Sequence, residues 1–170
     1  MTELAEVLSQ DFLYQHPERL VAFLGNHDQP RFLTLAGGDL GRLQMAQAFL
    51  LTTRRVPHLY YGDEIGMGAG TDRTDRSIRA DFPAAAFAGA AENAEFQFLR
   101  DLLRQRAEHP ALRHGELVQV LVEKDRYGYV RVAPEERILV VLNRAGSERP
   151  IEASGTRIEN PGPITIRTLK

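Results

Sequence analysis

The spacing of apolar residues changes near Pro110, and this change divides the chain into two parts. Before Pro110, segments of helical length alternate with short apolar runs, the rhythm of a parallel α/β sheet. After Pro110, only short strand-like runs separated by polar turns occur, which is typical of a small antiparallel sheet or sandwich. We therefore expect an α/β part over residues 1–109 and an all-β part over residues 110–170.

The expected elements follow from these local patterns. Apolar residues at helical spacing predict three helices, over residues 2–15, 39–53 and 93–107. Leu20–Leu24 (LVAFL) and Val56–Tyr60 (VPHLY) are continuous apolar runs, the form of strands buried on both faces. A charged, glycine-rich stretch over residues 62–91 predicts a long loop. The tail is expected to form strands over 117–123, 127–132, 138–143 and 164–168, with shorter ones near Ile151 and Ile158.

Composition excludes several classes of protein. Apolar residues make up 43% of the 170 residues, so a packed core is expected. The net charge is -2 with both signs mixed, so we expect neither a nucleic-acid partner nor a membrane partner. Cysteine is absent, which excludes disulfides and thiolate chemistry. Met1–Gln10 lacks the basic start of a signal peptide, which favours the cytoplasm, although a segment of a longer protein would not reveal its parent's export.

Polar side chains follow both predicted strands of the first part. Asn26, His27 and Asp28 come directly after the first strand, and Asp63 and Glu64 come shortly after the second. Ligands of parallel α/β folds bind outside the carboxyl ends of the strands. We therefore expect His27, Asp28, Asp63 and Glu64 to share one cleft.

Other interpretations of these residues remain open. Asn-His-Asp before Gln-Pro also fits a polar turn in which Asp28 is a helix N-cap, and Asp63 and Glu64 also fit a role in bracing the long loop. No spacing of the HxxxH or DxDxDG type supports a metal site that includes His27. We therefore expect no metal and no cofactor.

Three motifs occur in order, and together they resemble family 13 glycoside hydrolases, the α-amylase family. FLGNHDQPRF (Phe23–Phe32) is similar to the family's stretch at the end of barrel strand seven, and VPHLYYGDEIGM (Val56–Met67) to the stretch around strand eight. IRADFP (Ile78–Pro83) is similar to the R-x-D-F-P-G-G loop of neopullulanases and cyclomaltodextrinases. Arg55 stands where glycine is usual, and Ala84-Ala85 replace Gly-Gly.

The resemblance implies a fold and a site. The fold would be the last strands and helices of a (β/α)8 TIM barrel followed by a small antiparallel β-sandwich domain. Asp28 would be the third active-site carboxylate, which favours an oxocarbenium-like transition state. His27 and Asn26 would be substrate-binding residues, His27 by donating hydrogen bonds to sugar hydroxyls and Asn26 by orienting the loop. The rim would be shaped by Tyr60, Tyr61 and Glu64.

Other segments of the family pattern are missing from the sequence. A barrel of this kind takes about 250 residues, but Pro110 already marks its end. The family's D-x-x-x-N-H segment, its nucleophilic Asp in G-x-R-x-D-x-x-x-H and its acid/base Glu have no counterpart. A retaining glycosidase needs these last two carboxyl groups about 5–5.5 Å apart. The resemblance therefore implies part of an α-glucan (starch, maltodextrin or cyclodextrin) hydrolase that is inactive alone. Its partners would be α-glucan oligosaccharides and either the missing N-terminal barrel portion or a second copy.

The alternative is a non-catalytic carbohydrate-binding or interaction module derived from such an enzyme. Binding modules hold sugar rings by stacking them on exposed aromatic side chains. The tail has no tryptophan and few aromatic residues beyond Tyr127 and Tyr129. A binding module would retain glucan without turnover.

Overall fold

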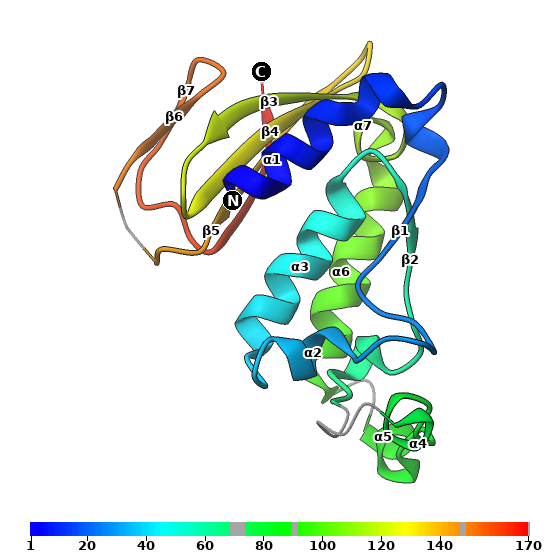
Figure 1. Ribbon diagram of the computed structural model, residues 1–170. Coiled ribbons are helices and arrows are strands. Elements are labelled where there is room, and N and C mark those ends of the chain that lie inside the picture. The colour runs from blue at the N-terminus through cyan, green and yellow to red at the C-terminus, as the bar shows by residue number, and fades with distance from the viewer. Residues whose placement is uncertain (69–73, 90–91, 147–148, 170) are drawn as a thin grey trace. The chain divides into compact units, whose positions relative to one another are not determined.

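The computed structural model describes residues 1–68, 74–89, 92–146 and 149–169 (Figure 1). The chain forms two compact units that alternate along the sequence. The first unit contains residues 1–20, 52–55 and 106–170, and the second contains residues 21–51 and 56–105. The domain boundary that the sequence places between residues 109 and 110 remains a prediction.

The first unit is built on a four-stranded antiparallel sheet in the order β3-β4-β5-β8. Its strands are β3 (Glu116–Val122), β4 (Arg126–Val132), β5 (Arg137–Asn143) and β8 (Ile164–Leu169). The β6–β7 hairpin (Ile151–Ala153 and Thr156–Ile158) packs its apolar side chains against Val130, Leu139 and Val141. All residues of β5 after Arg137 are buried, so the strand has cover on both faces. The predicted strands of the tail are confirmed.

Short helical segments complete the first unit. The predicted helix over residues 2–15 is only partly confirmed, because α1 (Thr2–Ser9) gives way to a 3₁₀ turn, η1 (Gln10–Leu13). Gln119 on β3 donates a hydrogen bond of 3.3 Å to the carbonyl of Ala5, which holds α1 near the sheet. A second 3₁₀ turn, η2 (Pro17–Arg19), and the short helix α7 (Pro110–His114) were not predicted.

The second unit contains a parallel pair of strands and two long helices. β1 (Val21–Phe23) pairs with β2 (Val56–His58), with Val21 opposite Val56 and Phe23 opposite His58. α3 (Leu40–Thr52) and α6 (Ala94–Glu108) confirm the other two predicted helices. Gln44 on α3 donates to Glu95 on α6 at 2.7 Å, and Figure 1 shows the two helices running alongside each other. The remaining elements are α2 (Phe32–Leu35), η3 (Asp63–Ile65), α4 (Asp75–Ile78) and α5 (Ala84–Gly89).

The prediction that both parallel strands are buried on both faces is wrong. Val21, Phe23 and Val56 are 58%, 42% and 49% exposed. Within the described ranges, the sheet they belong to contains β1 and β2 alone. Continuous apolar runs are normally covered on both sides by helices and flanked by further strands. The apolar pattern therefore indicates that β1 and β2 suit a position between flanking strands and covering helices, which the described residues do not provide.

A buried arginine joins three segments of the first unit. Arg131 on β4 is fully buried, and its guanidinium donates to the carbonyls of Thr52, Leu112 and Gly115 at 2.5, 2.9 and 2.8 Å. Thr52 is the last residue of α3, where helix carbonyls lack intrahelical partners. Burial lowers the pKa of Arg131 to about 10, so the side chain stays charged at neutral pH.

We expect Arg131→Lys to lower the free energy of unfolding of the first unit by about 2–4 kcal/mol, because an ammonium lacks the planar fork that reaches three carbonyls. The exposed Arg167 on β8 provides a matched control, and Arg167→Lys should change stability by no more than about 0.5 kcal/mol. Urea denaturation followed by circular dichroism measures both. Equal midpoints for the two variants would show that Arg131 contributes nothing specific.

Candidate functional site

The loop after β1 forms a tight polar turn around Asn26. The Asn26 side-chain oxygen accepts a hydrogen bond of 2.9 Å from the backbone N–H of Asp28, and its carbonyl accepts one from Gln29. This is the local turn that asparagine side chains favour. The helix that follows, α2, has Arg31 at its N-cap. The interpretation of Asp28 as a helix N-cap is therefore wrong for this helix, and Asn26 is the residue that shapes the turn.

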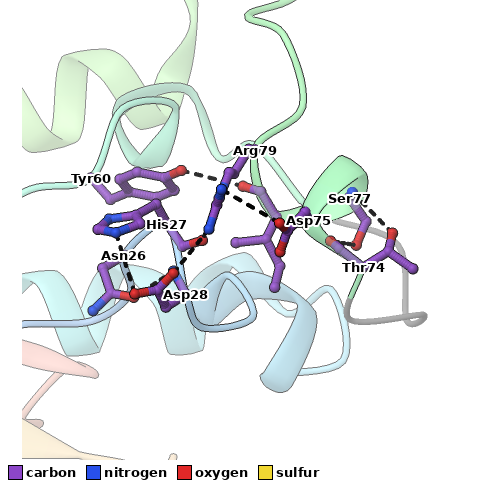
Figure 2. A network of polar contacts seen from close by, with 9 residues as sticks. Asn26, His27, Asp28, Tyr60, Thr74, Asp75, Ser77 and Arg79 are labelled. Atoms are coloured by element: carbon purple, nitrogen blue, oxygen red, sulfur yellow. Dashed lines mark hydrogen bonds and ion pairs between the residues drawn. The ribbon is translucent and has the colours of Figure 1, made fainter.

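The Asp28 carboxylate lies between two basic side chains. Its Oδ1 is 3.0 Å from Arg79 Nη2, and its Oδ2 is 3.2 Å from His27 Nε2. Arg79 also donates through Nε to the carbonyl of His27 at 2.9 Å. The side chains of His27 and Asp28 are 64% and 65% exposed, so both remain accessible to a ligand. Figure 2 shows Asn26, His27 and Asp28 grouped opposite Arg79.

The segment around α4 forms the opposite side of this site. Thr74 caps α4 by accepting a hydrogen bond from the backbone N–H of Ser77. Asp75 and Arg79 form an ion pair at 3.4 Å across one helical turn, which joins α4 to the contacts of Asp28. A surface hollow of about 410 Å³ lies beside them, lined by Asp75, Arg76, Arg79, Ala80 and Asp81.

Two tyrosines connect the exit of β2 to the same segment. The hydroxyl of Tyr61 donates to the carbonyl of Ala80 at 2.9 Å, and that of Tyr60 donates to the carbonyl of Ile78 at 3.4 Å. The IRADFP segment therefore contacts both loops, the one after β1 through Arg79 and the one after β2 through the carbonyls of Ile78 and Ala80. Arg79 was not singled out in the sequence, although it stands inside a motif that was.

Asp63 does not share the cleft with Asp28, so that expectation is wrong. Its side chain is only 6% exposed and lies 3.9 Å from Arg31 Nη1, whereas Asp28 faces solvent. The backbone carbonyl of Asp63 accepts a hydrogen bond of 3.0 Å from Gln47 on α3. Asp63 therefore braces the loop after β2, as the alternative interpretation has it. Glu64, its neighbour in η3, is half-buried.

The two aromatic residues that the sequence offers in the β tail, Tyr127 and Tyr129, are not available for stacking on sugars. Within the described ranges, no group of three His, Asp or Glu side chains is placed to hold a metal ion. No helix of the described chain is long and apolar enough to span a bilayer. Tyr127 and Tyr129 are fully buried in β4, so they present no face to a sugar ring.

Comparison with known proteins agrees with the motifs. The model of the alpha amylase catalytic domain matches residues 2–86, half of the chain. This chain belongs to the alpha-amylase family of glycoside hydrolases. A cyclomaltodextrinase from Geobacillus thermopakistaniensis is 31% identical over 87% of this chain, and neopullulanase 2 from Thermoactinomyces vulgaris is 31% identical over 86% of it. Both relatives carry names of the subgroup that IRADFP resembles, and a cyclomaltodextrin glucanotransferase from Geobacillus stearothermophilus is 35% identical over 75% of this chain.

The fold is also found in solved structures. The cyclic alpha-maltosyl-(1-->6)-maltose hydrolase of Arthrobacter globiformis matches with a TM-score of 0.82 and 23% identity, over 97% of this chain and 39% of that one. The chain spans only 26% of the Geobacillus protein and 25% of the Thermoactinomyces protein. The activities that these names describe therefore belong to whole proteins of which this chain matches only part.

The buried Asp63 predicts a pH dependence of stability. Burial raises the pKa of Asp63 from its ordinary 3.8 to about 6, against the opposing influence of Arg31. The folded state then binds this proton more tightly than the unfolded state, so stability falls as pH rises from about 4 to 6 and stays lower above that range. Since one pKa unit corresponds to about 1.4 kcal/mol, the penalty is at most about 3 kcal/mol.

We expect Asp63→Asn to remove this fall, whatever its absolute stability. Urea denaturation at pH values from 4 to 7 measures it, with the exposed Asp39→Asn as the matched control. Parallel pH profiles for the wild type and Asp63→Asn would contradict the assignment.

Proposed function

We propose that this chain is part of an α-glucan hydrolase and supplies Asp28 as the carboxylate that stabilises the transition state. The observation that carries the proposal is an exposed carboxylate held beside His27 at a strand end in a chain of this family. The β1 and β2 segments would be the last two strands of a (β/α)8 barrel. The antiparallel tail would be its β-sandwich domain, in line with the fold shared with the Arthrobacter structure.

The chemistry of retaining glycoside hydrolysis fits these residues. As the glycosidic bond breaks, positive charge develops at the anomeric carbon, and a nearby carboxylate lowers the energy of that state. Asp28 accepts hydrogen bonds from ring hydroxyls, and His27 donates one to the same sugar. Asn26 fixes the turn that carries both. The nucleophile and the acid/base that act with Asp28 have no counterpart in these 170 residues.

Substrate class follows from the relatives' names. The curated relatives are a cyclomaltodextrinase and a neopullulanase, and the Arthrobacter protein is a hydrolase of a cyclic maltosyl-maltose. All three names point to substrates built from glucose units in α linkage. The proposed ligand is therefore an α-glucan oligosaccharide.

The 170-residue chain by itself should not hydrolyse maltooligosaccharides or cyclomaltodextrins. The three carboxyl groups act as a unit, and one of them cannot substitute for the other two. A reducing-sugar assay with maltoheptaose checks this. Sustained release that disappears in Asp28→Asn would show that the chain is a complete enzyme of another kind.

A chimera tests the role of Asp28 directly. In it, this chain replaces the matching region of the Geobacillus cyclomaltodextrinase. We expect Asp28→Asn to lower kcat by about 10²–10³-fold, because it removes a preorganised contact to developing charge. The melting temperature should stay close to that of the parent chimera, since Asp28 is exposed. Glu64→Gln is the comparison variant, and an Asp28→Asn chimera with unchanged kcat would refute the proposal.

The proposed partner is either the remaining barrel portion or a second copy of this chain. Val21, Phe23 and Val56 expose apolar surface on a sheet that, within the described residues, has only two strands. Alone in solution, the chain should bury this surface by forming a dimer or a larger assembly. Light scattering should show that Phe23→Glu shifts the chain towards a monomer, whereas Val118→Glu, on the equally exposed face of β3, should not. A wild-type chain that stays monomeric, with protected amides in β1, would contradict this.

A further inference from the structure

A buried guanidinium connects the loop after β1 to the loop after β2. Arg31 is three residues beyond Asp28 and only 1% exposed. Its Nη1 donates to the carbonyl of Tyr61 at 2.6 Å and lies 3.9 Å from the Asp63 carboxylate. Its guanidinium carbon lies 4.7 Å from the centre of the Tyr60 ring and 4.8 Å from that of the Tyr61 ring. One side chain therefore contacts three residues of the neighbouring loop.

The space around this guanidinium is closely fitted. Gly62 has a φ of 88°, a conformation that favours glycine. A Cβ atom at Gly62 would lie 2.7 Å from Met67 Sδ and 3.0 Å from Arg31 Nη1. The backbone of the second loop thus passes directly against Arg31. Any residue larger than glycine at this position would displace the arginine or the methionine.

Arg31 also fixes the chain on which Asp28 sits. One end of the short loop leaves β1, and the other end begins α2, where the Arg31 carbonyl accepts hydrogen bonds from Thr34 and Leu35. Between these ends, Asn26 closes the turn around the Asp28 amide. Asp28 therefore lies within a short loop whose far end is held by the buried Arg31 side chain.

We infer that Arg31 is a positioning residue for Asp28, acting by locking the loop after β1 onto the Tyr60–Asp63 turn. The expected effect on catalysis rests on the proposed function. The coupling of the two loops does not, because it exists with or without bound sugar. Arg31 touches no substrate in this role. Its effect on the reaction passes through the place at which it holds the Asp28 carboxylate.

Lysine is the informative replacement at this position. Lysine keeps the positive charge opposite Asp63 but lacks the flat guanidinium that stacks on two rings and reaches a carbonyl at the same time. A residue that merely neutralised Asp63 would be replaced well by lysine. A residue that positions the loop through its shape would not.

Amide hydrogen exchange on the whole 170-residue chain tests the coupling. In Arg31→Lys and Arg31→Met, we expect at least tenfold faster exchange at Gln29 in the first loop and at Met67 in the second, whose amide donates to the Gly62 carbonyl at 2.8 Å. Amides of α6 should be unchanged. Arg42→Lys, an exposed arginine on α3, is the matched control and should alter neither loop.

Each outcome of the exchange experiment either supports or overturns the inference. Faster exchange in both loops of Arg31→Lys, with α6 intact, supports the inference. Wild-type exchange in Arg31→Lys, or a change confined to one loop, overturns it. If Arg31→Met unfolds the second unit, Arg31→Lys alone decides.

The chimera supplies the catalytic readout. There, Arg31→Lys should lower kcat by about 10–100-fold with little change in KM, because small misplacements of a catalytic group affect the transition state most. Unchanged kcat in Arg31→Lys, alongside coupled exchange, would overturn the catalytic meaning of the inference. A chimera that is inactive with Arg31 intact refutes the proposed function instead, and the exchange experiment still decides the coupling.

Discussion

Parallel pairing of β1 with β2 is the interaction on which the site depends. Parallel strands place their carboxyl ends at the same edge, so the turn holding Asp28 emerges next to the turn holding Tyr60 and Tyr61. Three pairs of residues make up this register. A ladder so short is weak by itself, because two-stranded sheets are marginal in water. The loops beyond it therefore need side-chain connections, and Arg31, Tyr60 and Tyr61 provide them.

Much of the fold could be predicted from the periodicity of the sequence. The long helices α3 and α6 and the strands of the tail were located because their apolar spacing extends over many residues. The burial of β1 and β2 was predicted wrongly. An apolar run shows that a segment favours burial, but it does not show that the rest of the chain covers that segment. The 3₁₀ turns and α7 were missed because turns of three to five residues leave almost no periodic signal.

The site was predicted in part, and the reasons differ from residue to residue. Asn26, His27 and Asp28 were identified because they stand together after a strand, within a recognisable motif. Asp63 looked equivalent by position, yet an isolated Asp gives no sign of whether it turns outward or inward. Arg31 and Arg79 were overlooked because their partners are 30 or more positions away, at Tyr61 and Asp28. Sequence spacing does not reveal contacts of that range.

The ion pair between Arg79 and Asp28 makes this site sensitive to salt concentration, although its proposed ligand is uncharged. Both side chains are about half exposed or more, so the pair is worth less than about 1 kcal/mol and weakens as dissolved ions screen it. The proposed sugar ligand carries no charge, but it would approach a carboxylate that Arg79 already contacts through Oδ1. Under the proposed function, the ionic strength of the medium would therefore affect the binding of a neutral sugar, through the ion pair that lies beside it.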